Sequence, residues 1–159
     1  KPYAKGTKMA NTTFTGPVTS TNGFVGAVTG NVTGNIANPT FTHTPEAINA
    51  TATATAAQVA TGYITSTSAA ATTITLPTGT LLGAALGAVQ GTVFDLYIDN
   101  TAGASTVTIA VAVNGILSAL AAAEAGGSGL LTIPAGVTGQ AQFTLMFSSA
   151  TAYTFSRVA

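Results

Sequence analysis

The sequence predicts an all-β protein with an extended amino-terminal arm over residues 1–44 and a jelly-roll-like β-sandwich, with one or two short helices, over residues 45–159. Two observations lead to this prediction. A four-residue repeat punctuated by glycine and asparagine fills much of the first part. The second part contains about seven or eight short runs rich in Val, Thr, Ile and aromatic residues, separated by turn residues, which is typical of a sandwich or jelly roll.

The arm is recognised by a short repeat that reads Val-Thr-Gly-Asn twice over residues 28–35. Phe24, Val28, Val32 and Ile36 recur every four residues, with glycines between them. Because four is a multiple of the two-residue alternation of a strand, these side chains share one face of an extended chain. Frequent glycine and β-branched residues disfavour a helix.

Such an arm is not expected to order by itself. Fixing the backbone costs about 1–2 kcal/mol per residue, whereas each large apolar side chain returns about 1.5–3 kcal/mol only when it is fully buried. We therefore expect the arm to lie against sister chains or in a groove of a larger partner. A flexible Gly/Asn/Thr linker is the alternative interpretation.

The second part is expected to consist of short strands and two helices. Strands are expected at Thr51–Ala56, Gln58–Thr65, Thr72–Leu76, Thr92–Asn100, Ser105–Val113, Gly129–Ile133, Gln140–Phe147 and Thr151–Val158. Alternation over residues 140–147 places Ala141, Phe143, Leu145 and Phe147 on one face. Leu and Ala at helical spacing predict helices at Thr80–Val89 and Ile116–Ala125, each needing support from the sheets because each is short.

The chain carries very little charge. Only 5% of its residues are Asp, Glu, Lys or Arg, against about 25% in a typical soluble domain. Enzymes need titratable groups held close together, so we expect no enzymatic activity. A formal net charge of zero gives no general attraction to nucleic acid, and no apolar run approaches the roughly 20 residues of a membrane-spanning helix. Weak self-repulsion favours a structural role in an assembly.

The few candidate chemical groups do not form a recognisable site. His43 is the single histidine and there is no cysteine, so no zinc site is expected. Asp95 and Asp99 share one face of a strand at a separation of about 13 Å, which is wide for a pair of glycosidase carboxylates. Asp99-Asn100 is interpreted as turn chemistry rather than a calcium site. Arg157 is expected to pair with a carboxylate within one chain or between subunits, with Asp95 and Asp99 as the candidates.

Several short segments, in this order, resemble a known module. They are Gly-Tyr-Ile-Thr at 62–65, Thr-Leu-Pro-Thr at 75–78, Phe-Asp-Leu-Tyr-Ile-Asp-Asn at 94–100, Ile-Pro-Ala-Gly at 133–136 and Ala-Tyr-Thr-Phe-Ser-Arg-Val at 152–158. This order resembles a β-sandwich module at the carboxyl termini of tailed-bacteriophage structural proteins, and the Val-Thr-Gly-Asn arm resembles the repeats that often precede such modules. Together they cover most of the chain. The resemblance implies a trimeric virion protein: a capsid decoration (cement) protein, a head fibre or a tail-fibre segment.

We therefore expect a non-enzymatic decoration protein, made in the host cytoplasm, that forms a homotrimer and docks on the major capsid protein at the outer surface of the phage head. The residues assigned to docking on the shell are Lys1, Lys5, Lys8, Phe14 and Val18, and those assigned to packing arms between subunits are Phe24, Val28, Val32 and Ile36. No cofactor, metal, nucleic acid, membrane or small-molecule substrate is expected.

The alternative function is a tail-fibre or head-fibre segment or tip that binds a host-surface glycan. Glycan sites usually offer exposed aromatic side chains beside several polar ones. Tyr and Phe are few in this chain and fall mostly inside predicted strands, which counts against this alternative.

Overall fold

The computed structural model describes residues 42–117 and 131–158, and this part of the chain is mainly β. Its elements in chain order are β1 (Glu46–Ala47), β2 (Ala52–Thr53), α1 (Ala56–Ala60), β3 (Tyr63–Thr65), β4 (Thr72–Thr75), α2 (Gly79–Leu86), β5 (Val93–Asp99), β6 (Val107–Ala110), β7 (Gly115–Leu117), β8 (Thr132–Ile133), β9 (Gln140–Ser149) and β10 (Ala152–Arg157). Residues 1–41 of the predicted arm and most of the predicted helix at Ile116–Ala125 lie outside the described residues; residues 116 and 117 belong to strand β7.

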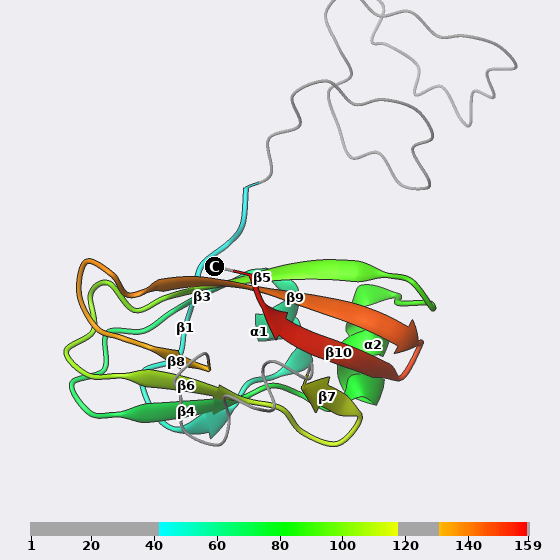
Figure 1. The fold of residues 1–159 in the computed structure, drawn as a ribbon, viewed down its shortest axis with the longest axis horizontal. Helices are drawn as coiled ribbons and strands as arrows, with labels where there is room; N and C mark the ends of the chain where they lie inside the picture. The colour runs from blue at the N-terminus through cyan, green and yellow to red at the C-terminus, as the bar shows by residue number, and fades with distance from the viewer. Residues whose placement is uncertain (1–41, 118–130, 159) are drawn as a thin grey trace, which may run out of the picture. The chain divides into compact units, whose positions relative to one another are not determined.

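The strands form two mixed sheets. The first sheet has the order β1-β3-β5-β9-β10-β7, and the second sheet has the order β2-β4-β6-β8. Figure 1 shows the sheets one above the other, with α1 near the middle of the view and α2 towards its right side. Since each helix follows a strand of the second sheet and precedes a strand of the first, both helices serve as connections between the sheets.

The chain crosses from one sheet to the other after each of its first eight strands. Neighbours within β1-β3-β5 and within β2-β4-β6 consequently run parallel. Antiparallel pairs occur where β9 joins β5 and β10 and where β8 joins β6. A jelly roll is built from antiparallel strands. The jelly-roll connectivity expected from the sequence is therefore not confirmed, although the mainly β fold is.

One apolar core receives side chains from both sheets. Leu96, Ile98 and Phe143 of the first sheet and Ile74 and Ile109 of the second are at most 1% exposed and belong to one cluster. The rings of Phe143 and Phe155 stack with centroids 4.7 Å apart. Full burial of each such side chain contributes about 1.5–3 kcal/mol to folding. The core thus holds the two sheets together, and the first of them carries the candidate functional site on its outward face.

Local sequence explains where the helices begin. Thr78 caps α2 by accepting a hydrogen bond from the Leu81 N–H, and Gly87 ends the helix with φ +59°. Thr55 and Gln58 form a capping box at the start of α1, each side chain bonding the other residue's backbone N–H. The expected strand at Gln58–Thr65 is therefore wrong over its first residues, which are helical, and correct over Tyr63–Thr65.

Candidate functional site

The outward face of the first sheet carries the most distinctive group of polar and aromatic side chains in the described chain. Strand register places Tyr63 beside Tyr97 and Tyr97 beside Gln142, while Gln140 lies beside Asp99. We call the surface formed by His43, Tyr63, Tyr97, Gln140 and Gln142 the tyrosine face.

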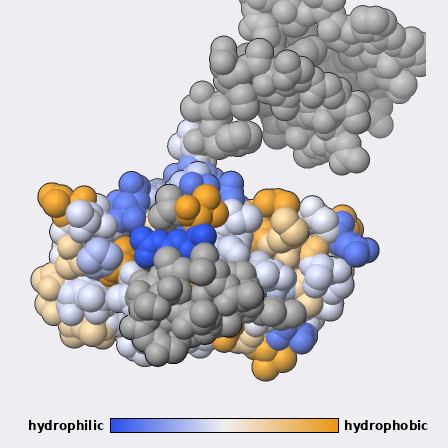
Figure 2. Space-filling view, in the orientation of Figure 1, coloured by the Kyte–Doolittle hydropathy of each residue, from blue (hydrophilic) through white to orange (hydrophobic). Residues whose placement is uncertain are grey.

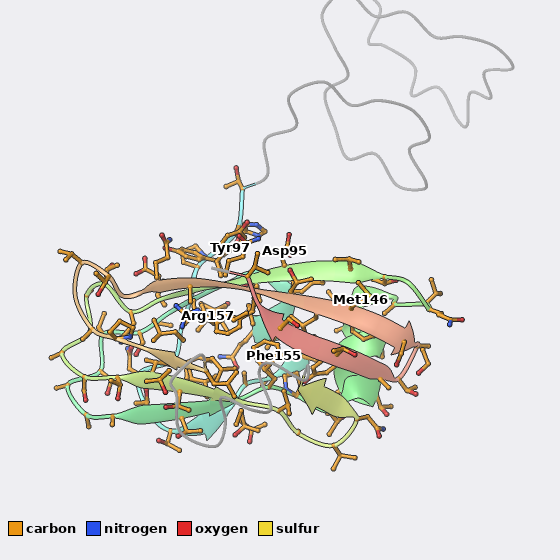
Figure 3. The ribbon with its side chains drawn as sticks, in the orientation of Figure 1. Asp95, Tyr97, Met146, Phe155 and Arg157 are labelled. Atoms are coloured by element: carbon orange, nitrogen blue, oxygen red, sulfur yellow. The ribbon has the colours of Figure 1, made fainter. Side chains whose placement is uncertain are left out.

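Alternation along β5 explains why Tyr97 points outward. Leu96 and Ile98 are fully buried, whereas Tyr97 between them is partly exposed. Asp95 and Asp99 share the outward side with Tyr97 because residues two apart on a strand face the same way. Figure 3 shows Asp95 and Tyr97 on the outer side of the sheet and Phe155 on the side that faces the second sheet.

A network of hydrogen bonds fixes the Tyr63 side of this surface. The Tyr63 hydroxyl donates to Asp99 Oδ2 at 2.6 Å. Asp99 Oδ1 accepts hydrogen bonds from the hydroxyl of Thr101 at 2.6 Å and from its backbone N–H at 2.9 Å. The bonds from Thr101 and then from Tyr63 lower the pKa of Asp99, and the same carboxylate raises the pKa of Tyr63. The expected turn chemistry at Asp99 is therefore confirmed, with a further role in orienting Tyr63.

His43 forms one wall of the tyrosine face. Its Nδ1 lies 2.9 Å from the carbonyl oxygen of Thr61, which can only accept, so Nδ1 carries the proton in this bond. The imidazole lies 5.8 Å from the Tyr97 ring, measured between centroids. Gly62 leaves room for the imidazole: with φ +78°, it adopts a conformation that favours glycine, and a Cβ there would lie 2.6 Å from Nδ1. His43 is exposed in the segment that precedes β1, and its bond to Thr61 holds the side chain in place.

The tyrosine face is hollowed. An open depression of about 530 Å³ is lined by Thr42, His43, Tyr63, Tyr97 and Gln140. A smaller one of about 200 Å³ is lined by Tyr97, Gln140, Ala141 and Gln142. Because Tyr97 and Gln140 line both, the two depressions adjoin.

Asn100 anchors the end of β5 from the inside. It is fully buried, and its Nδ2 donates to the carbonyl oxygens of Ser105, Ile133 and Pro134 at 2.8, 3.3 and 3.0 Å. Gly103 packs so closely against its side-chain amide that a Cβ there would overlap Oδ1. Asn100 therefore ties together the loops that follow β5 and β8, next to the carboxylate that orients Tyr63.

Two further charged side chains of the first sheet, those of Asp95 and Arg157, also bond to the fold. The Thr144 hydroxyl donates to Asp95 Oδ1 at 2.7 Å. Arg157 lies two residues after the buried Phe155 and four after the buried Tyr153, so it shares their side of β10 and points towards the second sheet (Figure 3). There it donates to the Thr132 carbonyl oxygen at 3.3 Å, and its guanidinium lies 6.0 Å from the centre of the Phe143 ring.

A second surface feature is apolar. A hollow of about 440 Å³ next to the start of α2 is lined mainly by methyl and methylene groups, from Thr53, Ala54, Thr55, Ala56, Pro77, Thr78, Leu81 and Ala112. Leu81 is 59% exposed at its rim. Figure 2 shows hydrophobic residues scattered over the viewed face among hydrophilic residues and residues of intermediate hydropathy.

The nine arm residues predicted to dock or to pack between subunits lie outside the described residues. They are Lys1, Lys5, Lys8, Phe14, Val18, Phe24, Val28, Val32 and Ile36. Sequence reasoning did not single out Tyr63 and Tyr97, which lie inside predicted strands and are partly exposed. The alternation of Asp95, Tyr97 and Asp99 is the signal that marks this face.

A metal site and a membrane-spanning helix are both absent from residues 42–117 and 131–158. No group of three or more His, Asp or Glu side chains is arranged to hold a metal ion there. No helix in this part of the chain has the length and apolar character needed to cross a membrane. No protein-family model, curated protein or solved structure matches the chain.

Proposed function

We propose that this chain is a non-enzymatic structural protein of a tailed-phage virion, most simply a trimeric decoration protein that docks on the shell of the major capsid protein. In this proposal the two sheets act as a β-sandwich module and residues 1–44 act as the fastening arm. The order of short segments that resembles phage structural modules motivates the proposal. The surface of the described residues supports it.

The observation that carries the proposal is the exposure of several large apolar side chains in a chain that has few charged residues. Met146 and Val93 are neighbours on β9 and β5, point outward and are 54% and 55% exposed. Leu81 and Val113 are 59% and 72% exposed. Because only 5% of the residues are charged, there is little electrostatic repulsion to prevent these side chains from contacting another protein molecule. The adjacent pair of Met146 and Val93 offers a small apolar area that can pack against another protein surface.

The charged side chains also suit a structural role. Asp99 holds the turn at Thr101, Asp95 accepts from Thr144, and Arg157 bonds the Thr132 carbonyl. These contacts stabilise the fold itself. A decoration protein needs no reacting groups, because its effect comes from binding energy alone.

The mechanism is linkage between binding and shell stability. A protein that binds the assembled shell but not its separated subunits stabilises each site by RT ln(1 + [L]/Kd), about 2.7 kcal/mol when its free concentration is one hundred times Kd. Many sites on one shell multiply this effect. Expected outcomes are thus a higher dissociation temperature for decorated shells and a dependence of that temperature on the concentration of the protein.

Heating shells with and without the purified full-length chain tests the proposal. Shells prepared without the chain should lose their integrity, followed by light scattering, at a lower temperature than shells to which it is added back. Bovine serum albumin at the same concentration is the control for non-specific protection. Equal survival with either protein would contradict the proposed function and favour the fibre alternative.

A further inference from the structure

We propose that the tyrosine face is a binding site for a neutral hexopyranose, such as a terminal sugar of a cell-surface glycan. This function goes beyond the proposed role on the shell and does not depend on it. The inference rests on the aromatic platform, the polar groups beside it and the signs of the nearby charges.

The platform is built by strand register. Tyr63 and Tyr97 are directly paired on neighbouring parallel strands, which lie about 4.8 Å apart, and both side chains are on the outward side. Tyrosine rings offer flat apolar surfaces with a negative face. One side of a pyranose ring presents C–H groups that carry a small positive charge, so it can lie against such a surface.

Polar side chains surround the platform where sugar hydroxyls need partners. Gln142 is the register partner of Tyr97, and Gln140 lines both depressions. Within the described part of the chain, the structure gives no hydrogen-bond partner to either glutamine side-chain amide. Each amide offers an acceptor and two donors, which suits the donor and acceptor character of a hydroxyl group.

The site is held in place before any ligand binds. The bond from Tyr63 to Asp99 fixes one phenol, and Asp99 is itself held by Thr101. His43 is held against Gly62 by its bond to the Thr61 carbonyl oxygen. A pre-formed site loses less conformational entropy on binding. The larger depression, about 530 Å³, has room for one or two sugar rings.

The charges favour a neutral ligand. Asp95 and Asp99 lie on the same outward side as Tyr97, and they repel anionic sugars and phosphate groups. Arg157 points to the opposite side of the sheet, towards Thr132. Single-stranded nucleic acid also stacks on aromatic rings, but its binding requires cationic side chains along the phosphate backbone. A neutral sugar therefore fits the tyrosine face better than a nucleic acid does.

The test is a titration of the full-length, ¹⁵N-labelled chain with the methyl glycosides of glucose, galactose, mannose and N-acetylglucosamine, followed by backbone amide chemical shifts. At least one glycoside should give saturable shifts centred on Tyr63, Tyr97 and Gln142. Dissociation constants should be on the order of 1–10 mM, as expected for one small ring on an open surface.

Three variants separate binding from folding. Tyr97→Ala should weaken binding by about tenfold or more, whereas Tyr97→Phe keeps the ring and should stay within about threefold of wild type. Val93→Ala is the matched control, because Val93 lies on the same side of β5 but about 13 Å away along the strand. It should bind like wild type. Each variant is first checked for an unchanged pattern of core amide signals.

Several results would overturn the inference: no saturable shift with any of the four glycosides, shifts centred near Met146 instead, or equal binding by Tyr97→Ala and wild type. If a six-residue oligothymidylate bound more tightly at the same amides, the ligand would be a nucleic acid instead of a sugar, and the inference would also be overturned. Tyr97→Ala should protect heated shells as well as wild type does, so failure of the sugar site and failure of the shell role are distinguishable.

Discussion

Replacing Asn100 tests how the loops that support the tyrosine face are held. The side chain is fully buried and its Nδ2 faces three carbonyl oxygens, of Ser105, Ile133 and Pro134, at 2.8, 3.3 and 3.0 Å. An amide nitrogen has two hydrogens, so it supplies two full hydrogen bonds, each contributing about 1 kcal/mol net. Leaving the carbonyls unpaired and a small cavity behind adds about 1–2 kcal/mol.

Asn100→Ala is therefore expected to lower the free energy of unfolding by about 2–4 kcal/mol. Asn100→Asp should cost more, although it keeps the size of the side chain, because a buried carboxylate would face carbonyl oxygens. The matched control is Asn49→Ala: Asn49 is exposed and accepts one hydrogen bond, from the Thr67 N–H at 2.8 Å. This control should cost about 0.5–1 kcal/mol.

Urea unfolding followed by far-ultraviolet circular dichroism measures these differences, provided that the slope with urea stays constant between variants. If Asn100→Ala and Asn49→Ala had the same small effect, the assignment of Asn100 as the tie between the two loops would be wrong. If Asn100→Asp were as stable as wild type at neutral pH, the arrangement of carbonyl oxygens around Nδ2 would be contradicted.

Three further predictions follow from the structure and the sequence. Gly83→Ala should lower the free energy of unfolding in urea by about 1–3 kcal/mol, because the new Cβ would overlap the Ala150 carbonyl oxygen. Glycine to alanine usually stabilises a helix, so the effect would be opposite to the usual one. Thr80→Ala, at an exposed position of the same helix, is the control and should cost no stability. The pKa of Asp99 is lower in the folded state than the ordinary 3.8, so its stabilising contribution is complete above pH 3.8 and is lost as the pH falls through the folded pKa. As the pH is lowered from 5, the free energy of unfolding of Asp99→Asn should therefore fall less than that of wild type. If the two proteins lost the same stability, this role of Asp99 would be refuted. Deleting residues 1–36 should leave the circular dichroism spectrum of a folded β protein but abolish sedimentation with shells; normal co-sedimentation would show that the arm is not needed for docking.

Much of the described fold was predictable from side-chain alternation. The strands expected at Thr72–Leu76, Thr92–Asn100, Gln140–Phe147 and Thr151–Val158 are present as β4, β5, β9 and β10. The helix expected at Thr80–Val89 is present as α2, within a few residues at its end. These segments were recognisable because large apolar residues alternate with polar ones or recur at helical spacing, and burial of one face then decides the structure.

The connectivity and one helix were not predicted. Alternation shows which side of a strand is buried but not which strand lies beside it. The sequence pattern therefore did not show that β1, β3 and β5 run parallel in one sheet and β2, β4 and β6 in the other. Helix α1 is a single short turn whose signal is the capping box of Thr55 and Gln58. The Thr–Ala alternation just before it favoured a strand, and the capping bonds outweighed that preference.

The tyrosine face required long-range register. Tyr63 and Tyr97 are 34 positions apart in sequence and became neighbours only through pairing of β3 with β5. The bond from Tyr63 to Asp99 likewise joins residues distant in the chain. The outward alternation of Asp95, Tyr97 and Asp99 was readable from the sequence alone, but the partners that turn it into a site were not.

The most direct measurement of the central claim is the position of this protein on the purified particle, determined by electron microscopy with an antibody against the folded region. Dense, regularly spaced label over the whole head is the expected result for a decoration protein. Label confined to the tail, or to a single appendage, would contradict it.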